Sequence, residues 1–458
     1  MEERWFKIKR IMLGIKGLDE LFKGIYKGSI ILLAGNPGTG KTTMAAKFIY
    51  EGAKMGEKGI YVSFVETKED FYRNMKDLGM DFSSLEEEGG FAFMEGITVS
   101  SVEALSEFLE EVIREMGEFG ADRIAIDSIS AVLQMGSQEI SKVREMMHNF
   151  FYRGAKVRGV TTILIEELPY GEVSVGYGIE EFIVDGVIIL KARIIKGKIY
   201  RYMEIRKMRG NEVKYGEIPF IIIPGDAVGI IKPEGISEIP SGVYPEKSIK
   251  VRIEDKEISI PIGSQNLLIF HPMIDPLPVF TWLGLRNFSQ YGYRIFCESF
   301  THNKRTVEDR IKLCLDRGDI ASGPEIKIFQ INPTAYTLDE IYYLTDLEER
   351  NVKPDIAVVN GIEILQELSD PKEYLNIQYN KLLRRMNRKI TGFYLIKHPL
   401  NKIEKIPLIN FYDNVFIFRP YLKGGVRYIG ISPYRIILNT RQRYEVFIKA
   451  DTLERCEL

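Results

Sequence analysis

Short apolar runs alternate with amphipathic segments along most of the chain. In the first half, apolar runs of strand length lie near residues 30–34, 59–64, 123–126, 161–165 and 185–191. Segments with helical spacing of apolar residues separate them, as at residues 101–116 and 139–158. Strands that alternate with helices favour a mostly parallel sheet covered by helices on both faces. The pattern therefore predicts the α/β fold class.

The pattern changes towards the middle of the chain. Three further apolar runs, at residues 200–205, 220–223 and 228–231, are separated by turns instead of helices, which predicts antiparallel strands at the sheet edge. Residues 232–248 then have no apolar periodicity and contain Pro233, Gly235, Pro240, Gly242 and Pro245. This composition is typical of a linker. We therefore predict two domains, residues 1–245 and 246–458.

The second half repeats the order of the first. Four pairs of segments match at near-constant offsets: 59–62 with 294–297, 124–127 with 357–360, 184–187 with 412–415, and 201–203 with 427–429. Two unrelated α/β domains with a generic pattern are the alternative, but a conserved order of matches favours an internal duplication.

A glycine-rich loop follows the first apolar run. Gly35-Asn36-Pro37-Gly38-Thr39-Gly40-Lys41-Thr42 fits the phosphate-binding pattern G-x-x-x-x-G-K-[ST] and leads, through Thr43, into a predicted helix. Glycines let backbone N–H groups point at phosphates, Lys41 reaches the β and γ phosphates, and the Thr42 hydroxyl ligates Mg²⁺. The alternative is a glycine-rich turn that matches by chance. Strand before and helix after favour a site for ATP and Mg²⁺.

Two acids end neighbouring strands of the predicted sheet. Asp127 ends the run at 123–126, so its carboxylate emerges beside the phosphate loop and is predicted to hold Mg²⁺. Helix capping by Asp127 is the alternative. Glu66 follows the run at 59–64 and is predicted to polarise the attacking water. For Glu66 the alternative is a surface acid at the start of a helix.

Residues 11–231 resemble the KaiC branch of the RecA superfamily, in an archaeal-type tandem arrangement. The resemblance is carried by residues 13–21, the phosphate loop, and residues 61–64, 127–130, 180–187 and 205–210. It implies two tandem RecA-like domains, each with a mostly parallel twisted sheet, flanking helices and an antiparallel edge. It also implies a homo-oligomeric ring, usually of six subunits, with ATP at each subunit boundary.

In that family a Lys-x-Arg pair, here Lys207 and Arg209, reaches the neighbour's γ-phosphate. Residues i and i+2 of a strand share a face, so both charges can point across one interface. Two solvated basic residues on an edge strand are the alternative. One departure from the family is important: Val65 stands where the family usually has the first of two glutamates. We therefore expect slow ATP hydrolysis that depends on Glu66, in a nucleotide-gated protein of signalling, timing or scaffolding.

The second half lacks this chemistry. Residues 268–278 replace the phosphate loop without glycine or lysine, and three prolines remove backbone donors. Asn360 stands at the position of Asp127, Thr301 near that of Glu66, Pro433 at that of Lys207 and Arg435 at that of Arg209. We therefore expect a degenerate domain that binds no ATP and docks an unknown protein partner.

Charge and composition narrow the class of protein. There are 62 Lys and Arg against 64 Asp and Glu, a net charge of −2, which predicts no general attraction to nucleic acid or membranes. A RecA/RadA-like DNA-binding recombination ATPase is the alternative function, but residues 166–176 carry three acids and no Lys or Arg where such proteins bind DNA. Three cysteines without C-x-x-C spacing, and no apolar leader, predict reduced thiols in the cytoplasm; abundant Ile, Lys and Glu indicate a thermophile.

Overall fold

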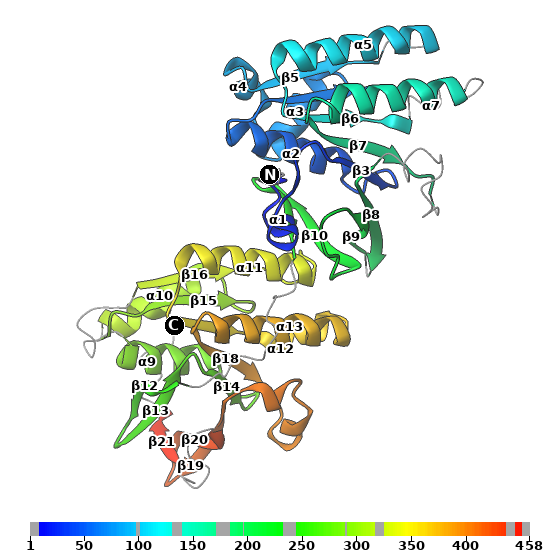
Figure 1. Cartoon of the computed structure of the whole chain (residues 1–458). Helices are drawn as coiled ribbons and strands as arrows, with labels where there is room; N and C mark the ends of the chain where they lie inside the picture. The colour runs from blue at the N-terminus through cyan, green and yellow to red at the C-terminus, as the bar shows by residue number, and fades with distance from the viewer. Residues whose placement is uncertain are drawn as a thin grey trace, which may run out of the picture. The chain divides into compact units, whose positions relative to one another are not determined.

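The computed structural model describes residues 9–97, 101–130, 140–170, 184–195, 197–231, 244–288, 291–316, 325–436 and 445–450 (Figure 1). It separates into two compact units, residues 1–232 and 233–458. The boundary predicted at 245/246 lies within β12 (Tyr244–Ile253), a strand of the second unit. Residues 232–243 of the predicted linker lie outside the described residues.

The first unit is built on one large sheet with the order β11-β10-β9-β8-β3-β7-β6-β4-β5 in its described part. Its parallel strands are β3 (Ile30–Gly35), β4 (Gly59–Ser63), β5 (Phe91–Glu95), β6 (Arg123–Asp127), β7 (Thr161–Glu167) and β8 (Gly186–Ile195). The antiparallel edge consists of β9 (Lys198–Met208), β10 (Glu217–Ile223) and β11 (Ala227–Ile230). The strands predicted from the apolar runs are confirmed, and β5 is an additional strand.

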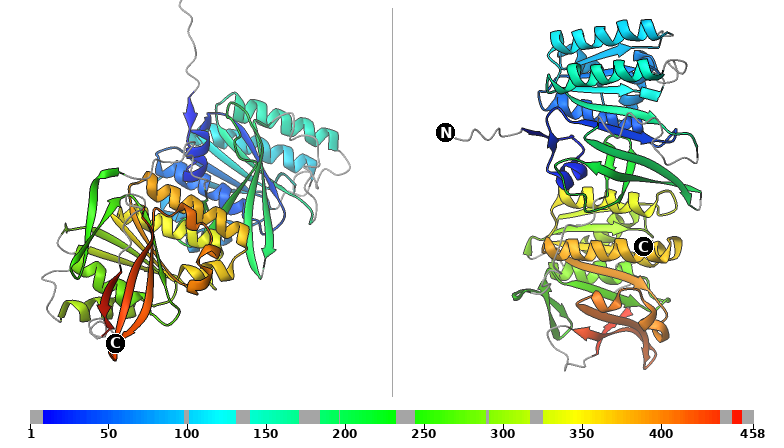
Figure 2. Two further views of the ribbon diagram at one scale, coloured as in Figure 1. Left: turned by 90° about the horizontal axis from the view of Figure 1, so that it is seen from below. Right: turned by 45° about the vertical axis from the view of Figure 1, so that its right-hand side comes forward.

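Helices cover both faces of this sheet, as Figure 2 shows. One face packs against α1 (Lys16–Phe22), α2 (Lys41–Lys54), α3 (Lys68–Asp77) and α4 (Phe82–Glu87). The other packs against α5 (Val102–Phe119), α7 (Ile140–Asn149) and the π-helical segment η1 (Phe150–Lys156). A short pair, β1 (Arg10–Ile11) with β2 (Ile25–Tyr26), stands apart from the sheet. The central strands β3, β4, β6 and β7 are buried along almost their whole length because both of their faces are covered.

The second unit has a sheet with the order β16-β15-β17-β18-β14-β19-β20-β21 among the described residues. Its strands are β14 (Gln265–Phe270), β15 (Arg294–Ser299), β16 (Glu325–Gln330), β17 (Ile356–Asn360), β18 (Thr391–Lys397), β19 (Asn414–Lys423), β20 (Val426–Ile436) and β21 (Val446–Lys449). One face packs against α9 (Pro276–Phe288), α10 (Lys304–Asp316) and the hairpin β12–β13 (Lys256–Ile262). The other packs against α11 (Leu338–Val352), α12 (Ile362–Leu368) and α13 (Pro371–Asn387).

The two sheets have the same topology, with β11 as an extra edge strand in the first. One side-chain contact is also repeated. Asp185 accepts a hydrogen bond from the backbone N–H of Ile30 at 3.1 Å, and Asp413 accepts one from that of Gln265 at 2.7 Å. Each aspartate ties the start of the central strand to its neighbour. Two tandem α/β domains of the RecA type, each with an antiparallel edge, are thus confirmed.

Two further findings concern the cysteines and the membrane. Cys297 is buried and free, whereas Cys314 is disulfide-bonded. The prediction of reduced thiols is therefore wrong for Cys314, because sequence spacing does not reveal which distant cysteines meet in the fold.

Among the described residues, no helix combines the length and the apolar character that crossing a membrane requires.

Candidate functional site

The phosphate loop connects β3 to α2 at the carboxyl edge of the first sheet. Gly38 and Gly40 have φ angles of 79° and 102°, a region that favours glycine. A Cβ atom on Gly40 would also come within 2.5 Å of Ile222. No side chain caps the start of α2. The first backbone N–H groups of the helix are thus left for a ligand, and the helix dipole favours an anionic one.

Asp127 lies beside this helix start, as predicted. Its Oδ2 atom accepts hydrogen bonds from the hydroxyls of Thr42 at 2.7 Å and Tyr61 at 2.9 Å. Burial raises the pKa of Asp127, and the two hydroxyls and Lys41 oppose that rise. Tyr61 was not among the predicted site residues. It stands on β4 opposite Ala125, two residues before Asp127 on β6. Only the register of the two strands reveals this contact.

Lys41 is buried and points along the loop. Its Nζ donates to the backbone oxygen of Asn36 at 3.0 Å and lies 3.9 Å from a carboxylate oxygen of Glu167. Burial lowers the pKa of Lys41, and Glu167 and Asp127 oppose that shift. Asn36 in turn donates to the backbone oxygens of Leu168 and Pro169. The loop is therefore held to the end of β7, and Glu167 joins the site without having been assigned a role from the sequence.

Glu66 occupies a tight turn after β4. The Ser63 hydroxyl donates to the backbone oxygen of Glu66 at 2.9 Å and accepts from its N–H at 3.0 Å. Burial and the negative charge of Asp127 raise the pKa of Glu66, while Asn74 donates to its carboxylate at 3.3 Å and opposes that rise. Val65, by contrast, is 59% exposed. Of these two adjacent residues, Glu66 is the less exposed, and its carboxylate is held by Asn74.

Lys207 and Arg209 lie at the other end of the strands. Gly35 at the loop pairs with Leu190 of β8, but Lys207 pairs with Val187, and the N–H of Arg209 donates to the oxygen of Asp185. At about 3.3 Å per residue, Lys207 lies about 10 Å and Arg209 about 17 Å from the level of the phosphate loop, measured along β8. The Lys207 ammonium donates to the oxygen of Val184, and Arg209 pairs with Asp185 at 3.2 Å. The fold does not bring them to the phosphate loop of their own chain.

Comparison with known proteins connects this geometry to a family. The family model of the KaiC ATPase matches residues 11–235. A UPF0273 protein of Pyrococcus horikoshii is 30% identical over 260 residues, which cover 53% of this chain and 96% of that protein. The chain belongs to the KaiC-type ATPases of the RecA superfamily.

Two longer KaiC proteins match the same half. The circadian clock protein KaiC3 of Synechocystis is 30% identical over 272 residues, 57% of this chain and 50% of its own length. The circadian clock oscillator protein KaiC of Thermostichus vulcanus is 33% identical over 259 residues, 54% of this chain and 49% of its own length. The chain thus spans about half the length of these KaiC relatives.

The second unit fills the corresponding site with its own side chains. Residues 271–275 connect β14 to α9 as residues 36–40 connect β3 to α2, so Asp275 stands where Gly40 does. Its carboxylate accepts from the N–H of Leu277 at 3.2 Å and pairs with Arg310 at 2.9 Å and His302 at 3.6 Å. A carboxylate of the chain therefore lies at the helix start where a KaiC phosphate loop leaves room for a ligand.

The structure corrects two of the expected equivalences. Ser299 bonds to both backbone groups of His302, as Ser63 does to those of Glu66, so His302 and not Thr301 stands at the Glu66 position. The His302 ring lies 3.1 Å from the Nδ2 atom of Asn360, the predicted counterpart of Asp127. The expectation failed because the match of residues 59–62 with 294–297 is one residue out of register. Strand pairing places Ser63 opposite Asp127 and Ser299 opposite Asn360, so Ser299 is the counterpart of Ser63.

The second correction concerns the basic pair. Lys207 pairs with Val187 next to a bulge in β8–β9, and Arg435 pairs with Val415 next to the matching bulge in β19–β20. Arg435 also donates to the backbone oxygen of Tyr412, the counterpart of Val184. Arg435 therefore corresponds to Lys207 and not to Arg209. Pro433, the predicted counterpart of Lys207, does not correspond to it. The counterpart of Arg209 is residue 437, outside the described residues.

The role of Asp275 as an internal anion gives a pH-dependent prediction. Burial alone would raise the pKa of Asp275, but His302, the Leu277 N–H and Arg310 together hold it well below its ordinary value. Its stabilisation is thus present above the unfolded-state pKa of about 3.9 and is lost as pH falls through the folded-state pKa. Asp275→Asn should destabilise the second unit at pH 7 by about 1–2 kcal/mol, a typical value for hydrogen bonds to charge.

The measurement uses the fluorescence of Trp282, which is buried in α9, in a Trp5→Phe background during denaturant unfolding. The difference between Asp275→Asn and its parent should shrink as pH falls from 4 towards 2. Asp309→Asn is the matched control, because its partner Arg305 is 90% exposed and such pairs contribute little. Equal effects of the two substitutions at pH 7 would contradict the internal-anion role.

Proposed function

We propose that the first unit binds one Mg·ATP and hydrolyses it slowly, within a homo-oligomer whose subunits share the site. The observation that carries this proposal is the convergence of Lys41, Thr42 and Asp127 on a helix start that no side chain caps. Cation, hydroxyl, carboxylate and free N–H groups are the set that a nucleoside triphosphate and its metal require.

The described residues fit both parts of Mg·ATP. The N–H groups of the loop and of the first turn of α2 would hold the phosphates, with Lys41 neutralising their charge. Thr42 and Asp127, already 2.7 Å apart, would hold Mg²⁺ as an oxygen ligand pair. When bound, Mg²⁺ neutralises charge that develops on the phosphates. Tyr61 fixes the orientation of the Asp127 carboxylate through its hydroxyl.

Glu66 is the proposed base that orients and deprotonates the attacking water. Its pKa, raised by burial and by the negative charge of Asp127, makes it a stronger base than an exposed glutamate. Val65 faces solvent and supplies no second carboxylate. Because Glu66 is then the one carboxylate of this pair that can activate water, we expect ATP hydrolysis to be slow.

The position of Lys207 and Arg209 supports a shared site. Both lie well back from the phosphate loop of their own chain, so a neighbouring subunit is the natural source of these charges for each site. Arg209 pairs with Asp185 in the isolated chain, an exposed contact that the interface can exchange for a phosphate. We propose a ring, six subunits being the family's usual number.

The wider role proposed is nucleotide-gated signalling, timing or scaffolding, with the second unit docking a protein partner in the cytoplasm. The names of the circadian clock relatives support timing or signalling. The alternative of a DNA recombination ATPase gains no support: Glu166 and Glu167 stand in the described part of the segment concerned, and residues 171–176 lie outside the described residues.

The first prediction is a stoichiometry of one ATP per chain. Calorimetric titration with a non-hydrolysable ATP analogue and Mg²⁺ should give one site, because Asp275 already fills the anion position of the second unit. Lys41→Ala should weaken binding at least about tenfold, since charge-assisted hydrogen bonds contribute about 1.5–3 kcal/mol. A stoichiometry of two would contradict the inert second unit.

The second prediction concerns Glu66. Glu66→Gln should leave ATP affinity within a small factor of the parent and lower the steady-state hydrolysis rate about a hundredfold or more, the usual contribution of a general base. Glu69→Gln is the matched control, an exposed glutamate in the first turn of α3. If both variants hydrolyse ATP like the parent, Glu66 is a surface acid.

The third prediction tests the shared site. Arg209→Ala should bind ATP but lose most hydrolysis, because an arginine supplied in trans is typically worth about 10³–10⁵ in rate. Arg206→Ala, the neighbouring arginine on the strand, is the control. Mixing Lys41→Ala chains with Arg209→Ala chains should restore activity, since some boundaries then combine an intact loop with an intact arginine. Proven subunit exchange without restored activity would refute the shared site.

A further inference from the structure

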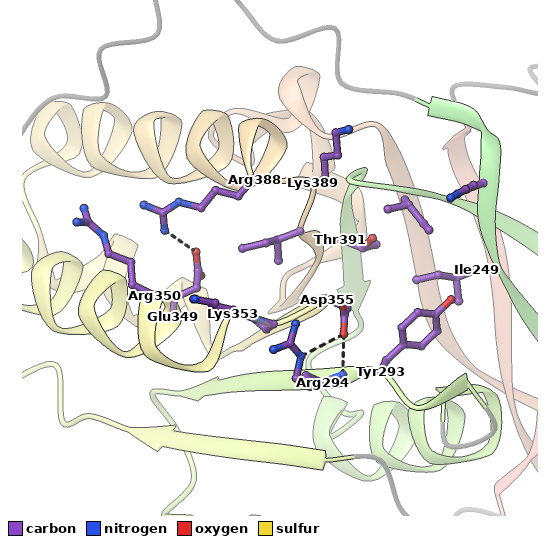
Figure 3. A pocket seen from close by; sticks show the side chains of 14 residues that line it. Ile249, Tyr293, Arg294, Glu349, Arg350, Lys353, Asp355, Arg388, Lys389 and Thr391 are labelled. Carbon is purple, nitrogen blue, oxygen red and sulfur yellow. Dashed lines mark hydrogen bonds and ion pairs between the residues drawn. The ribbon is translucent and has the colours of Figure 1, made fainter.

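The second unit contains a pocket of about 920 Å³, away from the phosphate-loop counterpart (Figure 3). It lies at the amino ends of β15, β17 and β18, with the ends of α11 and α13 on one side and the β12–β13 hairpin on the other. Asp275, by contrast, follows the carboxyl end of β14. Because these strands are parallel, the pocket and Asp275 occupy opposite edges of the sheet.

The residues that line the pocket are strongly basic. Two carboxylates, Glu349 and Asp355, stand against six cations: Lys247, Arg294, Arg350, Lys353, Arg388 and Lys389. Six minus two gives a local charge of +4. Asp346 lies behind the wall and pairs with Arg350 and Arg388, which reduces the charge to +3. The whole chain has a net charge of −2, so this concentration of positive charge is local.

Helix ends account for only part of this charge. Lys353 follows the end of α11, and Arg388 and Lys389 follow the end of α13, where cations complement the helix dipole. Each helix end carries about half a negative charge, so two ends offset about one unit of the +3. A net positive charge remains.

The interior behind the pocket does not neutralise it either. Three buried cations, Lys381, Arg384 and Arg385, pair with Glu298 and with Asp346 and Glu349, two acids that the charge of the pocket already includes. The interior therefore adds three positive charges and one further negative charge, that of Glu298, and has no surplus of acid. The positive charge of the pocket therefore faces the cavity.

Two of the lysines are available to a ligand. Lys247 and Lys353 are exposed, and within the described part of the chain neither has an acidic partner. They come from β12 and from the end of α11, so they lie on two sides of the pocket. The guanidinium of Arg294 lies 3.7 Å from the carboxylate of Asp355, and the side chain is 45% exposed. Between the charges lie Tyr293 and Ile249, labelled in Figure 3, with Ile262, Pro354 and Ile390.

We propose that this basic pocket binds a small organic polyanion, with two or more neighbouring phosphate or carboxylate groups and an apolar skeleton. The volume lies within the range of small-molecule sites. The lysines and Arg294 meet the anionic groups, and Tyr293 with the isoleucines meets the skeleton. The site is independent of the ATP site and gives the second unit a ligand of its own.

The test uses the full chain with Lys41→Ala, so that the phosphate loop contributes little. Isothermal titration with inorganic pyrophosphate and, separately, with citrate distinguishes phosphate from carboxylate as the preferred group. At least one should bind saturably, with one site per chain and tighter than about 1 mM. Lys247→Glu with Lys353→Glu should weaken that binding at least tenfold. Lys312→Glu with Lys423→Glu is the matched control, with two exposed lysines of the same unit outside the pocket.

Binding that survives the control pair and fails in the Lys247/Lys353 pair supports the site. Absence of binding by both anions overturns it, and so does an equal loss in both double variants, which would reflect only the overall charge. Thermal unfolding of each variant, followed by Trp282 fluorescence, establishes that the second unit is folded. Unaltered binding in the Lys247/Lys353 variant, with the unit folded, also overturns the proposal.

Discussion

Both units depend on one constraint: the helix that follows the central strand begins with backbone N–H groups and a positive dipole end that require an anion. The first unit leaves the start of α2 uncapped and surrounds it with Lys41, Thr42 and Asp127. The second unit meets the same requirement with the carboxylate of Asp275. The proposed nucleotide site and its counterpart in the second unit thus differ in the source of the negative charge at this helix start.

The two halves preserve their fold through contacts that have no part in this chemistry. Asp185 and Asp413 fix the central strands in the same way, and matching bulges place Lys207 and Arg435 on equivalent backbone oxygens. The second unit has, in addition, a buried charge cluster around Glu298 and Arg385 and a basic pocket at the amino edge of its sheet. Such a cluster is costly to break once buried.

The sequence was sufficient for what depends on local pattern. Strands buried on both faces read as apolar runs, and the phosphate loop reads as a motif, so the α/β class, the repeat and the convergence of Thr42 with Asp127 were predictable. Contacts that depend on register or on turn geometry were not. Tyr61 meets Asp127 across two strands, the pairing of β15 with β17 makes His302 the counterpart of Glu66, and the pairing of β19 with β20 makes Arg435 the counterpart of Lys207. Sequence spacing likewise concealed the disulfide of Cys314.

The turn after β4 and β15 has a consequence for how such a site changes over evolution. Its shape is fixed by the hydroxyl of Ser63 or Ser299 and by backbone groups, not by the side chain that it presents. A carboxylate in one unit and an imidazole in the other are therefore carried by the same backbone. A single substitution at this position can therefore change the functional group that the turn presents while the backbone of the turn is kept.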